Sequence, residues 1–309
     1  MTARIFYAAA ILAATLGCAH AQTPDNRGPD ARKSKGNIVV DAVPDVPGDD
    51  IFGFTSPTDI GNPGESALTN ENDSRFGKRD GRYSGINQKV ELSRTLSENW
   101  WLAGSFFMAG NHTRNVTGLP DRSSYGFDGL SFEVAYKLLN RSESNPFAVT
   151  LSVEPRYGRI DSTTGLASTN YGAAFKVFTD AVVVKDKLYW AANIEAATQR
   201  ARDPFGIAGF VPGSSLLLST ALTYQINPAF FVGAELRYFT NFDSGGFHHP
   251  VSRALYLGPT FAWRITEKVI LNAVIHAQIW GRAAANPVGS LNLDDFERYQ
   301  SRLKLTFNF

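Results

Sequence analysis

The chain alternates apolar and polar residues over long stretches, and this period of two is the feature that most restricts its fold. In residues 130–138 every second residue from Leu130 to Leu138 is apolar, and three of the four residues between them are polar. Residues 147–154 and 216–226 repeat the pattern. Such alternation predicts β-strands with one apolar and one polar face. No stretch beyond residue 21 approaches the ~18 consecutive apolar residues that would predict a membrane-spanning helix.

Short polar turns divide these strands into units of similar length. The residues before the turns, together with the last residue, are spaced 43, 45, 42, 39 and 44 apart: Leu96, Leu139, Val184, Ile226, Ile265 and Phe309. Each unit holds a turn, a strand, a long loop and a returning strand, with long loops expected at 113–126, 161–168, 203–214, 242–250 and 283–295. A propeller blade needs four short strands in this length, whereas strands of ~12 residues leave room for two and can cross a bilayer. The units therefore predict a ladder of hairpins.

The two faces of the predicted strands favour a membrane barrel over a soluble sandwich. In an outer-membrane barrel the apolar face meets lipid, aromatic residues girdle both interfaces and the polar face lines the lumen. Aromatic pairs such as Trp100–Trp101 and Phe230–Phe231 lie near strand ends, and full charges lie in mid-strand. We therefore predict an all-β fold, a transmembrane antiparallel up-and-down barrel. Its lumen is predicted to be lined by Lys89, Glu91, Glu133, Lys137, Glu154, Arg156, Lys176, Asp180, Glu195, Glu235, Arg237, His276, Arg298, Arg302 and Lys304.

The last strand is the most specific part of the pattern. Leu303, Leu305, Phe307 and Phe309 alternate with Arg302, Lys304, Thr306 and Asn308, and the chain ends on an aromatic residue. In this the chain resembles bacterial outer-membrane β-barrel proteins, and residues 88–100 are similar to hairpins of barrel families described as transporters or as having unknown function. The resemblance implies an outer-membrane location with both termini in the periplasm, contact with outer-membrane lipid, and recognition of Phe309 by the barrel-assembly machinery. It identifies no single characterised protein.

The first residues predict an export signal. One positive charge at Arg4, an apolar run over 8–16 and the sequence Ala19-His20-Ala21 predict a signal peptide over residues 1–21, cleaved between Ala21 and Gln22. A lipoprotein signal acylated at Cys18 is the alternative, but Leu16 lies one position too close to the cysteine. Cys18 is the only cysteine, so the mature chain is expected to contain neither a disulfide nor a thiolate metal site.

Residues 22–64 are rich in Pro, Gly, Asp and Asn and show little periodicity. This composition predicts an unstructured periplasmic arm. The alternative is a plug or docking arm that uses the apolar islands at 38–40 and 51–54. The barrel is then expected over residues 65–309. Eleven strands can be counted from Tyr83 to Phe309, and an even number requires a twelfth within 65–78, a segment of poor strand composition. Ten strands remain the alternative if residues 65–82 are irregular.

The lumenal charges suggest porin-like or transporter-like passage of a small polar solute. In this reading Arg298, Arg302 and Lys304 form a basic stripe facing Glu133, Glu154, Glu195 and Glu235 across the lumen. A narrow barrel filled by paired charges, with a structural or surface role, is the alternative. A barrel lipid hydrolase is a third and weaker reading, because His112 lacks a nearby serine motif. The balance of 30 basic and 29 acidic residues argues against nucleic acid as a partner, and no cofactor is predicted.

Two histidine positions are candidates for a metal or catalytic site. His276 lies on the predicted inward face of its strand, where a hydrogen-bonded lumenal role is favoured over a catalytic one. His248 and His249 are adjacent in a predicted loop without a spaced carboxylate, which is a weak metal signal. We therefore predict no metal site and no catalytic residue.

Deleting Phe309 should lower insertion into the outer membrane without altering the chemistry of the lumen, because the resemblance implies that this aromatic terminus is read during assembly. The measurement is the amount of folded barrel in purified outer membranes, compared with a Phe309→Tyr variant that keeps an aromatic end. Equal amounts of the truncated and full-length proteins would contradict the assignment.

Overall fold

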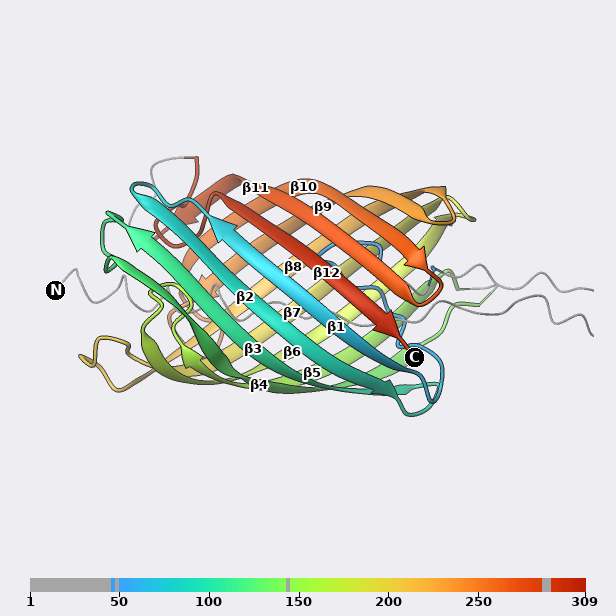
Figure 1. Ribbon diagram of the computed structural model, residues 1–309, viewed down its shortest axis with the longest axis horizontal. Coiled ribbons are helices and arrows are strands. Elements are labelled where there is room, and N and C mark those ends of the chain that lie inside the picture. Colours follow the sequence, from blue (N-terminus) through green and yellow to red (C-terminus); the bar gives the residue numbers. More distant parts are fainter. Residues whose placement is uncertain (1–45, 48–49, 143–144, 285–289) are drawn as a thin grey trace, which may run out of the picture.

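The computed structural model describes residues 46–47, 50–142, 145–284 and 290–309. Twelve strands form one closed barrel in which each strand pairs antiparallel with its neighbours in sequence, and β1 closes the ring against β12 (Figure 1). The strands are β1 (Ser66–Phe76), β2 (Arg82–Thr95), β3 (Trp100–Arg114), β4 (Arg122–Leu139), β5 (Phe147–Ile160), β6 (Ala167–Val184), β7 (Leu188–Arg202), β8 (Phe210–Asn227), β9 (Phe230–Phe242), β10 (Pro250–Thr266), β11 (Val269–Ala283) and β12 (Tyr299–Asn308). The predicted fold class and strand number are confirmed.

The strand that composition made doubtful is present. β1 pairs with β12 from Ala67↔Asn308 to Phe76↔Tyr299 and with β2 over its whole length. Both strands at the point of closure are short, with 11 residues in β1 and 10 in β12. The ten-strand alternative is therefore wrong. No helix in the described part of the chain is long and apolar enough to span a membrane.

The connections differ at the two ends of the barrel. Turns of a few residues, such as 185–187 and 267–268, join strands at one end, which we call the short-turn end, and Ser66 and Phe309 also lie there. The opposite, long-loop end carries the connections 115–121, 161–166, 203–209, 243–249 and 284–298. In Figure 1 all strands are tilted relative to the long axis of the barrel, as closure of a sheet requires.

The two faces of the wall separate apolar from polar side chains. Large apolar side chains cover the outside, with Leu130, Phe132 and Phe175 each about half exposed (48–57%). Charged side chains of the same strands point inward and are buried, including Glu133 next to Phe132 and Lys176 next to Phe175. This arrangement is the reverse of a soluble β-sandwich and matches the polar interior of a membrane barrel.

The region predicted as an unstructured arm is placed differently. Residues 50–61 run inside the barrel, where Ile51, Phe52 and Ile60 are fully buried, and residues 62–64 lie at its rim. We call residues 50–64 the inserted segment. The prediction of an arm is wrong for this part, because it assumed that a segment without periodicity lacks a core, whereas the barrel wall supplies one. Residues 22–45 and the predicted signal peptide lie outside the described residues.

Candidate lumenal site

The inserted segment enters and leaves the barrel at the short-turn end. At one side the Gly64 amide donates to the Thr95 carbonyl, and Ile60 packs against Trp101. At the other side Ile51 and Phe52 pack with Val46 in a cluster that includes buried side chains of the opposite wall: Tyr189, Ala191, Ala221, Phe231 and Ala262. The middle of the segment, at Phe54, reaches the central part of the lumen. The segment is thus a loop that fills the half of the lumen next to the short turns.

Glu235 of β9 is the principal anchor of this loop. Its carboxylate accepts hydrogen bonds from the Phe54 amide (3.0 Å), the Thr55 amide (2.5 Å) and the Thr55 hydroxyl (2.5 Å). Gly53 makes the approach possible, with φ of +93° and no room for a side chain: a Cβ there would lie 2.8 Å from Glu235 Oε2. Hydrogen bonds from uncharged donors to a carboxylate are worth about 1.5–3 kcal/mol each. This interaction fixes the tip of the loop.

A second carboxylate holds the returning arm of the loop. Asp180 of β6 accepts from the Thr58 amide (2.7 Å) and the Thr58 hydroxyl (3.0 Å), and Arg141 pairs with the same carboxylate. The Thr150 hydroxyl donates to the Thr58 carbonyl (2.5 Å). The backbone N–H and the backbone carbonyl of Thr58 are therefore both hydrogen-bonded to side chains of the barrel wall.

The first residues of the loop are held by an ion pair and by wall side chains. Asp50 pairs with Lys304 of β12, and the Asn272 side-chain amide donates to the Asp50 carbonyl (3.0 Å). The Thr223 hydroxyl donates to the Ile51 carbonyl (3.2 Å). Every one of these contacts is polar and non-covalent, so the loop is bound to the wall as a ligand would be.

Phe54 sits among cations at the centre of the lumen. The guanidinium groups of Arg237 and Arg302 lie 3.8 Å and 4.3 Å from its ring centroid, and the His276 ring lies 5.3 Å away. Cation–π attraction of this kind is strongest where water is excluded. Two guanidinium groups thus lie against one aromatic ring inside the lumen.

The inward charges are paired with one another. Lys176 lies 3.1 Å from Glu133 and 2.6 Å from Glu154, and Arg302 lies 2.9 Å from Glu71 and 2.7 Å from Asp73. His276 Nε2 lies 3.2 Å from Glu235 Oε2, and Lys89 lies 2.9 Å from Glu91. Removing one partner of such a buried pair leaves the other charge without compensation and destabilises the folded protein by about 3–5 kcal/mol. Pairing is therefore what allows so many charges in one lumen.

The long-loop end is narrowed by two loops that fold inward. The carboxylate of Glu297, fully buried, lies 3.3 Å from Lys78 and 3.6 Å from Arg75. Burial alone would raise the pKa of Glu297, but attraction by these two cations outweighs it and holds that pKa below its ordinary value. In the second loop the Ser162 carbonyl accepts from Arg75 (3.0 Å), and burial raises the pKa of Asp161.

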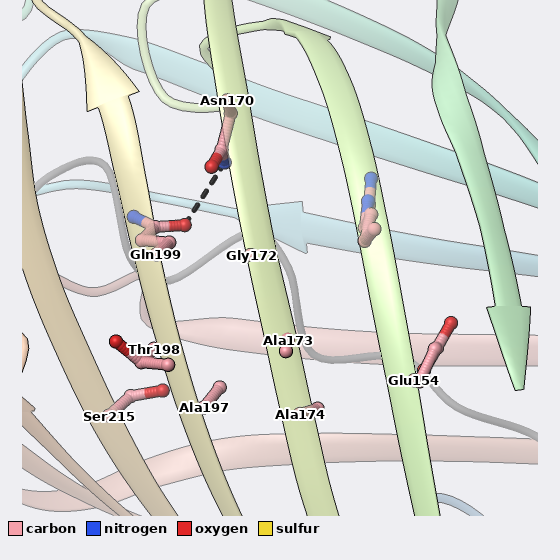
Figure 2. A pocket seen from close by; sticks show the side chains of 10 residues that line it. Glu154, Asn170, Gly172, Ala173, Ala174, Ala197, Thr198, Gln199 and Ser215 are labelled. Atoms are coloured by element: carbon pink, nitrogen blue, oxygen red, sulfur yellow. Dashed lines mark hydrogen bonds between the residues drawn. The ribbon is translucent and has the colours of Figure 1, made fainter.

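Between the loops and the inserted segment the wall is lined by small residues and a cavity opens. Gly172, Ala174 and Ala197 leave space there, and Figure 2 shows Asn170 and Gln199 hydrogen-bonded (3.0 Å) at its edge, with Glu154 on the neighbouring strand. The cavity is open to solvent, and its empty space together with that open solvent measures about 400 Å³. Asn170 Oδ1 and the Ser215 hydroxyl are buried beside it and have no hydrogen-bond partner among the described residues.

A second cavity of about 350 Å³ lies at the tip of the inserted segment. It is lined by Phe54 and Ser56 of the segment and by Lys176, Glu195, Arg237 and Arg302 of the wall, among others. Lys176 lines this cavity and its partner Glu154 lines the first, so one ion pair connects the two spaces.

Most of the predicted lumenal residues do face inward. Those buried inside are Lys89, Glu91, Glu133, Glu154, Lys176, Asp180, Glu195, Glu235, Arg237, His276, Arg302 and Lys304. Lys137 and Arg156 are half-buried, and Arg156 pairs with Asp128 at 2.6 Å. Arg298 is exposed, lies before β12 begins and stacks near Tyr299, so its predicted place in the lumen is wrong. The alternation of apolar and polar residues continues to Arg298 in the sequence, but β12 begins only at Tyr299.

The predicted basic stripe is organised differently. Arg302 pairs with acids of the adjacent β1, and Lys304 pairs with Asp50 of the inserted segment. Several other inward charged residues are absent from the prediction, among them Asp50, Glu71, Asp73, Arg75 and Asp128. Asp128 turns inward at a β-bulge, where the β3–β4 register shifts between Phe107 and Met108, a feature that strict alternation does not signal. Glu71 is one of the alternate residues of β1 that face inward, so the alternation predicts its position once residues 66–76 are assigned as a strand.

The hydrolase reading finds no support in the geometry. His112 lies on the outside of β3, opposite Ser84 of β2 and Ser123 of β4, yet it makes no hydrogen bond to a serine in the described part of the chain. A nucleophile and base within hydrogen-bond reach are the mark of such a site. Nor do three His, Cys, Asp or Glu side chains gather to hold a metal anywhere in the described residues.

The fold and the lumen define the class of protein, and comparison with known proteins agrees. The barrel is similar to the COG4313 outer membrane channel from Pseudomonas putida F1, with a TM-score of 0.59, 13% identity, and coverage of 88% of this chain and 100% of that chain. The NanC porin (TM-score 0.45, 14% identity, 78% and 98% coverage) and the KdgM porin (0.46, 11%, 79% and 99%) also match. The fold is that of outer-membrane channels, a conclusion carried by the first match.

The sequence itself places the chain in one family. It belongs to the family of unknown function DUF6662, whose model matches residues 44–309 and so spans the inserted segment as well as the barrel. No curated protein matches the chain.

Substituting Glu235→Gln should loosen the inserted segment, because an amide offers one acceptor oxygen where the carboxylate satisfies three donors. The measurement is the rate at which a water-soluble maleimide labels a cysteine introduced at Ser56, which is 2% exposed. The loss of one to two charge-assisted hydrogen bonds predicts labelling at least about tenfold faster.

The matched control for this variant is Glu195→Gln, which removes a buried lumenal acid that makes no hydrogen bond to the inserted segment in the described structure. It should leave the labelling rate near that of the parent. Equal acceleration by both substitutions would mean that general loss of lumenal charge, and not the Glu235 anchor, controls access.

Proposed function

We propose that this protein is an outer-membrane channel for small polar solutes, in which the inserted segment is a displaceable plug. The observation that carries the proposal is the loop bound by polar side chains of the wall beneath a cavity that is open to solvent. The two arms of the segment pack Ile51, Phe52 and Ile60 against apolar side chains of the wall. Its central peptides, by contrast, are held by carboxylates that a change of conformation can release.

The chemistry of the lumen supports a polar solute. The cavity presents the carboxylate of Glu154, the guanidinium of Arg156 and the amides of Asn170 and Gln199. Charged and amide groups at the edge of a confined pore create local fields that orient dipolar or zwitterionic molecules. The long-loop end would admit the solute, and movement of the segment would release it at the short-turn end.

A filled, non-conducting barrel is the second candidate, and the extensive ion pairing favours it. Lys176 and Arg302 each lie between two carboxylates, so the wall itself narrows the lumen even without the segment. The two candidates differ in what happens when the segment is removed or locked in place.

Locking the segment to the wall should close the channel reversibly. The hydroxyl oxygens of Thr55 and Ser219 lie 2.9 Å apart, so Thr55→Cys with Ser219→Cys places two sulfur atoms within bonding reach in a chain whose own cysteine lies in the predicted signal peptide. In planar bilayers the oxidised double variant should show no conductance steps, and reduction should restore those of the single variants.

Deleting residues 50–61 supplies the complementary test. The deletion should give steady conductance larger than that of the parent, with barrel folding checked by the shift in gel mobility on heating. A folded deletion variant that stays silent would establish the filled barrel and refute the channel.

Replacing Arg302→Gln in the deletion variant should shift ion selectivity towards cations, because Glu71 and Asp73 would lose the cation between them. The measurement is the reversal potential in a salt gradient. Arg302→Lys, made in the same deletion variant, keeps the charge and should leave the reversal potential near that of the deletion variant with Arg302. An unchanged potential in Arg302→Gln would mean that this cluster does not line the conducting path.

A further inference from the structure

Two neighbouring strands carry amide side chains on the outside of the barrel. Asn70 and Asn72 alternate with buried inward residues of β1, and Gln88 is one of the alternate residues of β2 that face outward. In the twelve strands, all of whose residues the structure describes, these are the outward-facing Asn and Gln side chains away from strand ends. Elsewhere the same face is dominated by Leu, Val, Phe and Ile. We call Asn70, Asn72 and Gln88 the amide patch.

The amide patch lies at mid-height of the wall. Four residues of β1 precede Asn70 and four follow Asn72, and Gln88 is near the middle of β2, directly opposite Asn72. A β-strand needs ~9–11 residues to cross the hydrocarbon core, so in a membrane these amides lie near its centre. In Figure 1, β12, β1 and β2 lie side by side on one face of the barrel.

The patch satisfies only part of its own hydrogen-bonding capacity. Asn70 Oδ1 accepts from Asn72 Nδ2 (3.0 Å) and Gln88 Nε2 (3.4 Å), and Gln88 Oε1 accepts from the Tyr125 hydroxyl (2.7 Å). The Asn70 amide nitrogen and the Asn72 amide oxygen have no partner among the described residues. Lipid chains offer neither donors nor acceptors, so these groups are costly in the hydrocarbon region unless something else covers them.

We propose that the amide patch is the contact through which two copies of this chain pair side by side in the membrane. A two-fold interface is self-complementary, so the unpartnered donor of Asn70 in one copy meets the unpartnered acceptor of Asn72 in the other, and the reverse. The patch carries no net charge, which disfavours a lipid headgroup, and its depth places it beyond the reach of soluble proteins. Leu68 and Val90 beside it supply the apolar contacts that surround hydrogen-bonded groups in such interfaces.

Cysteine cross-linking in native outer membranes tests the contact directly. Asn72→Cys should form a disulfide-linked dimer of this chain on mild oxidation. The matched control is Ile194→Cys, which faces outward (49% exposed) from the middle of β7, on the opposite side of the ring, and should remain monomeric. No dimer from Asn72→Cys, equal dimer from both variants, or cross-linking of Asn72→Cys only to a different protein would each overturn the proposal.

The strength of the contact is tested by removing its hydrogen bonds. The triple variant Asn70→Leu, Asn72→Leu and Gln88→Leu should raise the dimer dissociation constant in vesicles at least about thirtyfold, as expected for the loss of several membrane hydrogen bonds. The control Thr179→Leu removes an outward polar group of β6 and should leave the constant unchanged. If the triple variant does not fold, Asn72→Leu alone provides the same measurement with the Asn70–Gln88 bond retained. An unchanged dissociation constant in the folded variant would overturn the proposal.

Discussion

Charge neutralisation inside a closed wall is the constraint on which this structure depends. The strands must bury one face inward, and in a membrane barrel that face is the polar one. Each ion removed from water costs several kcal/mol unless a partner compensates for it. The lumen meets this requirement with local clusters, such as Lys176 between Glu133 and Glu154, and not with a field between two opposed walls.

The inserted segment completes this neutralisation. Glu235 receives two backbone amides and a hydroxyl from it, and Lys304 receives the carboxylate of Asp50. The wall thus contains charges whose partners come from a different part of the chain, which links the stability of the lumen to the position of the loop. Gly53 permits the close approach, because any side chain there would collide with Glu235 and Thr260. Release of the segment would therefore require both the separation of these polar contacts and the exposure of Ile51, Phe52 and Ile60, which pack against the wall.

The sequence predicted the wall well and its contents poorly, for a physical reason. Alternation with period two reports which face each residue occupies, and the turns report where strands reverse, so eleven strands and twelve of the inward residues follow from local pattern. The inserted segment has no period, and its contacts join residues about 180 positions apart, as between Thr55 and Glu235. Local pattern also fails at Asp128, where a bulge changes the face, and at Arg298, where the strand has not yet begun.

β1 shows most clearly why composition misjudged part of the wall. Its inward face carries Glu71, Asp73 and Arg75, which pair with β12 and with the loop at the long-loop end. Its outward face carries Asn70 and Asn72. A strand whose outward face is apolar at its ends and polar in its middle loses the alternation by which strands are recognised, although its backbone pairs with both neighbours over nearly its whole length. The interruption of the apolar face at Asn70 and Asn72 places amides, and not hydrocarbon, at the middle of the outer surface of this strand. β1, which closes the ring, therefore carries charged side chains on its lumenal face and amide side chains on its outer face at the same height.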